Sequence, residues 1–277
     1  MDWIYNISTP SLVLLSIVSY TIFGVGGMLL SRRWVRRLHR TDHSQNDVVS
    51  YFFAAAAVFY GVTLGLITIG VWTNYTNAQD KVDRETQAVA GLYRTAEGFD
   101  SPRRALLQQD LVHYTDQVIH VSWPQQKMGT PAIGSGLLLE TLQQHILAFT
   151  PVTTSEQILQ TQMLTQFNNL AEAKHARMDA VGVGIPSAMW SLVLLGAVIT
   201  IVITWCFDLK SPAMHLCMTT MLTSLLGLII ALTAAFDNPF RGDVSVSPEP
   251  LERMYQQMES GLQPSNTPVA TAVSLHR

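Results

Sequence analysis

The sequence predicts an all-α integral membrane protein with four transmembrane helices and an extramembrane helical bundle inserted between the second and the third. Three observations lead to this prediction. Charged residues make up only 13% of the 277 residues, against roughly 25% in an average soluble protein. The mean hydropathy is positive, at +0.22. Four apolar segments contain no Asp, Glu, Lys or Arg, and each has the ~20 residues that a helix needs to cross the bilayer.

The four predicted spans are residues 11–30, 51–73, 186–206 and 212–236. The second span lies inside a longer stretch, 48–79, that carries no charge at all. At about 1.5 Å of helical rise per residue this stretch exceeds the thickness of the hydrocarbon core. We therefore predict that the second helix continues beyond the membrane.

The placement of arginines predicts the orientation. Residues 1–10 contain no Lys or Arg, whereas the 31–50 loop contains five arginines, at Arg32, Arg33, Arg36, Arg37 and Arg40. This polarity is the reverse of a cleaved signal peptide, and short loops rich in Lys and Arg stay cytoplasmic. The arginines either set the topology and contact anionic headgroups or form a polyanion site. We predict that the 31–50 loop and the 207–211 link are cytoplasmic, and that residues 1–10, 74–185 and 237–277 are external.

The external segment has the pattern of a small helical bundle. We predict helices over 74–97, 101–123, 137–149 and 154–178. Ser101-Pro102 is a typical helix start, and Thr154 with Gln157 fits a capping box. In the tail we predict one short amphipathic helix over 251–258 and disorder over 264–277.

Enzyme and metal signals are weak. The sequence contains no HExxH, CxxC, GxSxG or glycine-rich phosphate motif, so we predict a protein that is not an enzyme and has no cofactor and no metal. His113 and His120 lie seven residues apart near Asp110 and Asp116, a set that either binds a metal weakly or is an ordinary solvated helix surface. His215 either gates a path by protonation or lies at the membrane interface. A net charge of −3 argues against nucleic-acid binding.

The absence of charge within the spans argues against pumps and coupled transporters. A passive pore and a plain anchor both remain, because apolar constrictions can gate a pore without charged groups. In the second span, Gly61 and Gly65 serve either close helix packing or pore lining. In the fourth, Thr219, Thr220 and Thr223 either line water or bond back to their own helix. Asp237, Asn238 and Arg241 form either a pore mouth or a helix end closed by an ion pair.

Several stretches resemble the bacterial bestrophin-like domain family. They are DNPFRGDVSVSPEPL after the fourth span, the 59–94 run that begins FYGVTLGLITIGVW, the HVSWP around Trp123, and LAEAKHARMDA followed by GIPSAMWSLVLLGAVITI. The resemblance covers residues 58–251. Asn238 stands where the family usually has an arginine.

This resemblance implies kinship with bestrophins, which are pentameric anion channels with a pore lined by the second transmembrane helix. It makes Phe53 and Tyr60 pore-lining candidates, beside Thr63 and Thr68 of the same span. Bestrophins keep their helical domain in the cytosol, whereas the arginine bias of this chain predicts an external one.

We therefore predict a homo-oligomer, pentameric by family analogy, in the bacterial inner membrane, which conducts inorganic anions passively. The alternative is an envelope sensor or scaffold whose external domain binds a partner. A membrane enzyme is the third and weakest hypothesis.

Overall fold

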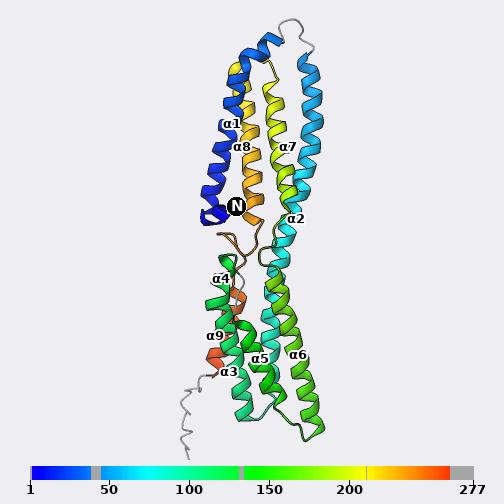
Figure 1. The fold of residues 1–277 in the computed structure, drawn as a ribbon, viewed down its shortest axis with the longest axis vertical. Helices are drawn as coiled ribbons and strands as arrows, with labels where there is room; N and C mark the ends of the chain where they lie inside the picture. Colours follow the sequence, from blue (N-terminus) through cyan, green and yellow to red (C-terminus); the bar gives the residue numbers. More distant parts are fainter. Residues whose placement is uncertain (1, 39–44, 131–133, 210, 263–277) are drawn as a thin grey trace, which may run out of the picture. The chain divides into compact units, whose positions relative to one another are not determined.

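The computed structural model describes residues 2–38, 45–130, 134–209 and 211–262, and within these ranges the chain is helical and contains no strand (Figure 1). The chain divides into two compact units. Unit 1 consists of Met1–Asp80, Gln125–Pro131 and Ala176–Ser247. Unit 2 consists of Lys81–Pro124, Ala132–His175 and Pro248–Arg277. The assignment to an all-α class is confirmed for the described residues.

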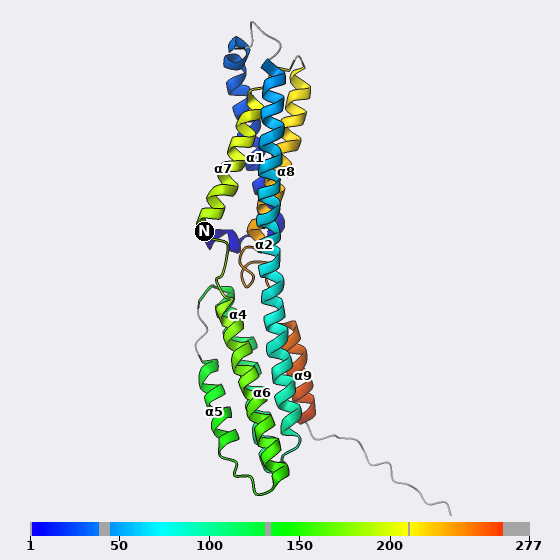
Figure 2. The same cartoon turned by 90° about the vertical axis from the view of Figure 1, so that its right-hand side faces the viewer.

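Unit 1 contains α1 (Thr9–Leu38), the first part of α2 (Gln45–Ala96), α7 (Ser187–Trp205) and α8 (Pro212–Phe236). These four helices are long and apolar enough to cross a membrane. Both views show the three shorter helices and the first part of α2 running alongside one another (Figures 1 and 2). One buried cluster, formed by Leu64, Val193, Ala197 and Ile230, joins α2, α7 and α8.

The prediction that the second span continues as one helix is confirmed, because α2 runs without interruption from Gln45 to Ala96. No proline interrupts this stretch. Beyond Asp80 the apolar residues form a helical stripe, and Val82, Val89 and Leu92 are fully buried in unit 2. The helix therefore changes from an apolar rod to an amphipathic one without changing its backbone.

Unit 2 also contains α3 (Ser101–Gln117), a π-helical turn η2 (Val118–Ser122), α4 (Trp123–Lys127, shared with unit 1) and α5 (Ser135–Leu147). The sequence predicted one helix to residue 123, and the π-turn carries it past Pro124. Proline has no N–H to donate and its ring clashes with the carbonyl four residues earlier. A π-turn shifts the hydrogen bonds by one residue, which lets the chain stay helical through Trp123-Pro124.

Helix α6 (Thr154–Asp179) begins at the predicted residue, but its cap differs from the prediction. The capping box consists of Thr153 and Glu156, not Thr154 and Gln157. The Glu156 carboxylate accepts hydrogen bonds from the backbone N–H groups of Thr153 (2.9 Å) and Val152 (2.7 Å), and Thr153 Oγ1 accepts one from the Glu156 N–H (3.2 Å). The Glu156 carboxylate is favoured over the Gln157 amide because a charged acceptor binds N–H donors more strongly than an amide does.

The helix near the C-terminus belongs to unit 2. It is α9 (Glu249–Leu262), longer than the predicted 251–258 segment. Leu251 and Met258 are fully buried, and the Tyr93 hydroxyl of α2 donates to the Met258 carbonyl at 3.4 Å. The predicted disordered segment, 264–277, lies outside the described residues.

Glycines with positive φ mark the turns before α7 and after α8. Gly182, before α7, has a φ of +79°, and Gly242, after α8, has a φ of +83°. The second turn is closed by a hydrogen bond from the Val246 N–H to the Pro239 carbonyl at 2.7 Å. A short 3-10 helix, η1 (Asp2–Asn6), precedes α1.

Candidate functional site

The turn that follows α8 holds the beginning of α7. Asp237 is buried, and its carboxylate accepts hydrogen bonds from the Ile185 N–H at 2.7 Å and from Trp190 Nε1 at 3.0 Å. A Cβ at Gly184 would lie 3.1 Å from both carboxylate oxygens, so a larger residue there would push the carboxylate aside. The carboxylate also lies near the N-terminal end of α7, where a negative charge is favourable.

The same turn holds the N-terminal segment of the chain. Asp243 Oδ2 accepts a hydrogen bond from the N–H of Thr9, the first residue of α1, at 3.0 Å. The Asn238 amide donates to the Tyr5 hydroxyl, and the Arg241 guanidinium lies over the Tyr5 ring, 4.7 Å from its centroid. Two carboxylates of one turn therefore serve the beginnings of two different helices.

A cavity of about 660 Å³ lies beside this turn, between the beginnings of α1 and α7 and the end of α8. The three residues predicted to form an outer mouth, Asp237, Asn238 and Arg241, all line it. It also has hydroxyl groups along its wall, from Ser16, Ser19, Tyr20, Ser187 and Ser191. Sites of this size, with a few polar groups on an apolar wall, suit small molecules.

Three of the four candidate pore residues of α2 contact other segments of the same chain. The Tyr60 hydroxyl donates to the Val193 carbonyl of α7 at 3.0 Å. Thr68 Oγ1 bonds to the Leu64 carbonyl at 2.8 Å and lies 3.0 Å from Thr233 Oγ1 of α8. Phe53 meets Phe207 edge-on, with ring centroids 5.9 Å apart. The Thr63 hydroxyl donates to its own helix, to the Phe59 carbonyl at 2.8 Å.

Two of the three candidate threonines of α8, Thr219 and Thr223, lie against α1. Thr219 and Thr223 are buried, and Thr220 is half-buried. Thr223 Oγ1 donates back to the carbonyls of Thr219 (2.8 Å) and Thr220 (3.1 Å), and Thr219 Oγ1 lies 3.7 Å from Met28 Sδ. Gly24 of α1 packs against the Thr223 side chain. Of the two alternatives for Thr223, the bond to its own helix is the one observed.

One face of α2 is left uncovered. Val58, Val62, Leu66 and Ile69 are each 59–65% exposed and follow one another at spacings of four, four and three residues, on a single helical face. Beside them, a Cβ added to Gly61 or Gly65 would meet no atom within 4 Å. We call Val58, Val62, Leu66 and Ile69 the free face of α2.

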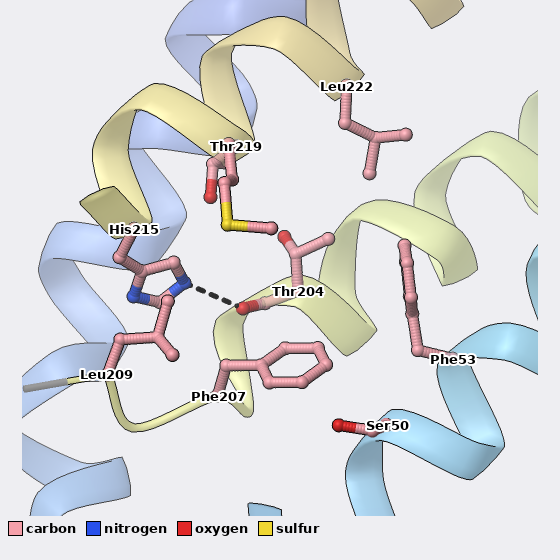
Figure 3. Close-up of a pocket in the computed structure, with 9 residues that line it drawn as sticks. Ser50, Phe53, Thr204, Phe207, Leu209, His215, Thr219 and Leu222 are labelled. Atoms are coloured by element: carbon pink, nitrogen blue, oxygen red, sulfur yellow. Dashed lines mark hydrogen bonds between the residues drawn. The ribbon is translucent and has the colours of Figure 1, made fainter.

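A second pocket, of about 500 Å³, lies where α2 begins and α7 and α8 are linked (Figure 3). Phe53 and Ser50 lie on one side of it and the buried His215 on the other. His215 Nε2 is 3.0 Å from the Thr204 carbonyl, in the last turn of α7. An imidazole N–H that satisfies a helix-end carbonyl gives His215 a capping role.

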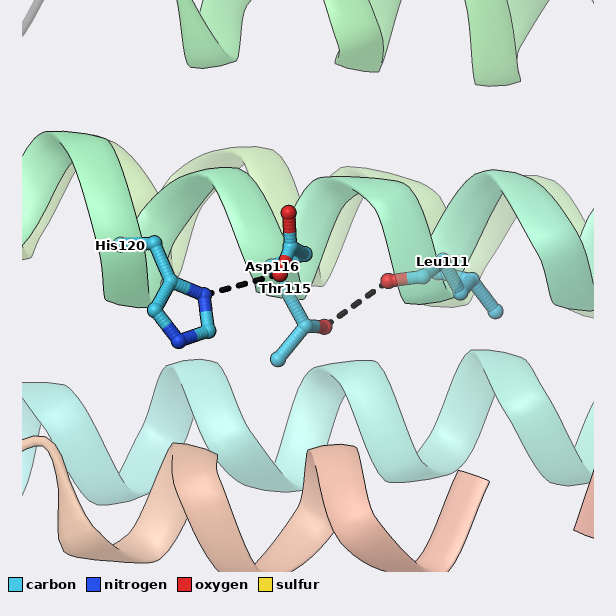
Figure 4. A network of polar contacts seen from close by, with 4 residues as sticks. All are labelled: Leu111, Thr115, Asp116 and His120. Carbon is cyan, nitrogen blue, oxygen red and sulfur yellow. Dashed lines mark hydrogen bonds and ion pairs between the residues drawn. The ribbon is translucent and has the colours of Figure 1, made fainter. Parts of the chain in front are cut away.

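The histidines of unit 2 form separate pairs with carboxylates. His145 Nδ1 lies 2.5 Å from Asp110 Oδ2, which connects α5 to α3. His120 Nδ1 lies 2.8 Å from Asp116 Oδ1, one turn away on the same helical segment (Figure 4). Desolvation, together with the carboxylates of Glu259 and Asp116, raises the pKa of the nearby Tyr255. Within the described ranges no three His, Cys, Asp or Glu side chains gather into a metal-binding group.

With this geometry in place, the comparisons with known proteins place the chain in a family. The model of the family described as the Bestrophin-like domain matches residues 18–251. The chain belongs to this family. Among curated proteins, none matches the sequence of this bestrophin-like protein. It is a membrane protein by its family and by its four apolar helices.

Solved structures share the fold of this bestrophin-like chain. A point mutant of a bacterial bestrophin homologue from Klebsiella pneumoniae is 13% identical, with a TM-score of 0.66, and the alignment covers 91% of this chain and 99% of that one. The same homologue solved by Zn-SAD phasing is 13% identical, with a TM-score of 0.62 and coverages of 89% and 94%. A crystal structure described as a membrane protein is 12% identical, with a TM-score of 0.68 and coverages of 91% and 99%.

Sequence reasoning missed two features of this bestrophin-like protein. Asp243 lies in the quoted DNPFRGD stretch, but its spacing from Asp237 does not indicate that it meets Thr9, more than 200 residues earlier in the chain. The free face of α2 was also missed, because an all-apolar helix does not indicate which of its sides its neighbours leave open.

Proposed function

We propose that this bestrophin-like protein is a homo-oligomeric, passive, anion-selective ion channel whose pore is lined by α2. The free face of α2 carries this proposal. On the opposite side of the helix, Leu64 and Tyr60 pack against α7 and α8, so the face that remains is open to a second copy, to lipid or to an ion path.

Two properties of the free face favour a pore wall formed by several copies. A ring of apolar side chains from repeated subunits forms a constriction that gates by dewetting. Gly61 and Gly65 lie at the border of the face with open space above them. Small residues at this spacing allow helix backbones to approach closely, which supports packing of α2 against the α2 of a neighbouring subunit.

Passive conduction is supported by the spans themselves, which contain no Asp, Glu, Lys or Arg. Coupled transport normally depends on such groups. Anion selectivity and a pentameric assembly rest on kinship with bestrophins. The sequence-based pore candidates stay predictions, and the free face is the better-supported wall.

Chloride flux into liposomes that contain the purified protein tests this proposal. Wild-type protein should conduct more than empty liposomes do. Val62→Ala should raise the flux, because each subunit then presents a smaller and less apolar side chain to the constriction. Val198→Ala is the matched control, since Val198 is an exposed valine of α7 outside the proposed wall, and it should leave the flux unchanged.

Two outcomes would refute the channel. One is a wild-type flux equal to that of empty liposomes across varied voltage, pH and calcium. The other is an equal response of Val62→Ala and Val198→Ala, which would remove α2 from the pore wall.

We also propose that both termini and unit 2 lie outside the bacterial inner membrane, from the arginine-rich segment after the first span. Cys206→Ser and Cys217→Ser remove the natural thiols, and Val152→Cys introduces one on the surface of unit 2, where Val152 is 87% exposed. A membrane-impermeant maleimide should label this thiol in intact cells. Labelling only after the cells are opened would place unit 2 in the cytosol, the side on which bestrophins keep their helical domain.

A scaffold function is the second candidate, and one observation favours it. Leu147, Val152 and Ile158 are all more than half exposed near the α5–α6 connection of unit 2. Exposed apolar residues in one region often mark a contact surface. A scaffold predicts no flux above empty liposomes, and crosslinking from Val152→Cys to another protein.

A further inference from the structure

A groove of about 630 Å³ runs along α1 beside the end of α7. Ile22, Gly26, Leu30 and Trp34 of α1 line it, together with Trp205 of α7. Leu30 is 85% exposed and Trp34 is 65% exposed, so these large apolar groups have little cover from the rest of the described chain.

The groove has a fixed wall and an open floor. Trp205 Nε1 donates to the Gly24 carbonyl at 2.9 Å, and its ring lies against Gly27, so this indole cannot swing into the groove. Gly26 forms the floor, because a Cβ placed there would meet no atom within 4 Å. This shape matches an extended hydrocarbon chain.

Two arginines continue the same face of α1. Ile22, Gly26 and Leu30 follow at steps of four residues, and Arg33 and Arg37 follow at steps of three and four, which keeps all five on one side of the helix. Both arginines lie within α1 and are exposed. Trp34 lies between them along the chain, where the apolar part of the face meets the cationic part, and indoles favour this level of a membrane.

We propose that this face of α1 binds one anionic phospholipid, with an acyl chain in the groove and the phosphate between Arg33 and Arg37. Arg32 lies about 100° around the helix from Arg33 and is half-buried. It therefore faces away from the site. An apolar groove that ends in two cationic side chains matches an amphiphile. A free inorganic anion has no apolar part that would occupy the groove. The site is independent of any conduction by α2.

Lipid titration followed by native mass spectrometry tests the site. The purified wild-type protein, stripped of lipid in detergent, should bind phosphatidylglycerol in preference to phosphatidylcholine with the same acyl chains, at one molecule per subunit. Arg33→Gln with Arg37→Gln should weaken phosphatidylglycerol binding by about 25-fold, because each arginine near an anionic headgroup contributes about fivefold.

The matched control is Arg32→Gln, which removes the same charge from the neighbouring position and should leave the affinity unchanged. Gly26→Leu fills the groove with both arginines still present, and it should weaken the binding of long-chain phosphatidylglycerol while short-chain phosphatidylglycerol binds as before. Equal affinity for the two lipid classes would overturn the proposal. So would equal losses from the Arg32 and the Arg33/Arg37 variants, since binding would then follow net charge alone.

Discussion

Asp237→Ala is expected to loosen the end of unit 1 where α7 begins and α8 ends. The carboxylate accepts two hydrogen bonds, from the Ile185 N–H and the Trp190 indole. A hydrogen bond to a charged group contributes about 1.5–3 kcal/mol. The dipole of α7 favours the carboxylate, and the dipole of α8, whose C-cap is Asp237, opposes it, so these two contributions largely cancel. Because Asp237 is 7% exposed, water replaces these bonds poorly. We expect a loss of about 3–5 kcal/mol, the lower part of the combined range.

In a protein of this size a loss of 1 kcal/mol lowers Tm by about 2 °C, so Asp237→Ala should lower it by about 6–10 °C. Tm is followed by the loss of the monodisperse peak in size-exclusion chromatography after heating, at one fixed heating time because membrane proteins unfold irreversibly. Asp237→Asn keeps one acceptor oxygen and should fall between wild type and Ala.

Trp190→Phe removes only the indole donor and provides the internal check. Because Trp190 and Asp237 share one bond, the double variant Trp190→Phe/Asp237→Asn should lose less stability than its two single variants together. Asp80→Ala, at an exposed position of α2, is the control and should change stability by less than about 0.5 kcal/mol. A Tm for Asp237→Ala within about 2 °C of wild type would refute the stabilising role of the Asp237 hydrogen bonds.

Two further predictions concern helix starts and helix contacts. Hydrogen bonds from the Thr153 and Val152 N–H groups lower the pKa of Glu156 below its usual 4.5, so the charged cap stabilises α6 above that pH and is lost as the pH falls through the lowered pKa. Hydrogen-exchange protection factors of the first turn of α6, which are corrected for the intrinsic pH dependence of exchange, should fall at acid pH in wild type and stay constant in Glu156→Gln. A wild-type protection factor that does not change with acid would contradict the prediction. Gly196→Ala places a methyl group against the Tyr60 ring and should cost about 1–3 kcal/mol by overpacking, measured as a fall in Tm. Gly70→Ala is the control, because a Cβ there meets no atom within 4 Å, and it should not lower Tm; equal effects of the two variants would contradict the contact.

The four long apolar helices were predictable because their signal is local. Each is a run of uncharged residues long enough to cross a bilayer, and composition alone reveals such a run. The continuity of α2 was predictable for the same reason, since neither proline nor a turn signal interrupts it. Two residues of the turn after α8 explain it locally, since Pro239 cannot continue a helix and Gly242 adopts a positive φ.

Contacts that depend on the exact reach of a side chain, or on segments far apart in the sequence, could not be predicted. Thr153 with Glu156 and Thr154 with Gln157 both match the capping pattern, and only the reach of each side chain to the backbone separates them. The pairing of His145 with Asp110 joins α5 to α3, and no spacing along the chain indicates it. The burial of Leu251 and Met258 in unit 2 similarly depends on where the chain returns after α8.

The amino-acid pattern was sufficient for the class of protein, its helices and its family. It did not indicate which face of each apolar helix packs against its neighbours, because these helices are predicted to lie in a membrane. Lipid is as apolar as a helix core, so a spanning helix needs no polar side and loses the periodicity that orients a helix in a soluble protein. Thr223 and Val62 illustrate this. The sequence left Thr223 open between lining water and bonding to its own helix, and it gave no orientation for Val62, whereas packing buried Thr223 against α1 and left Val62 on the free face of α2.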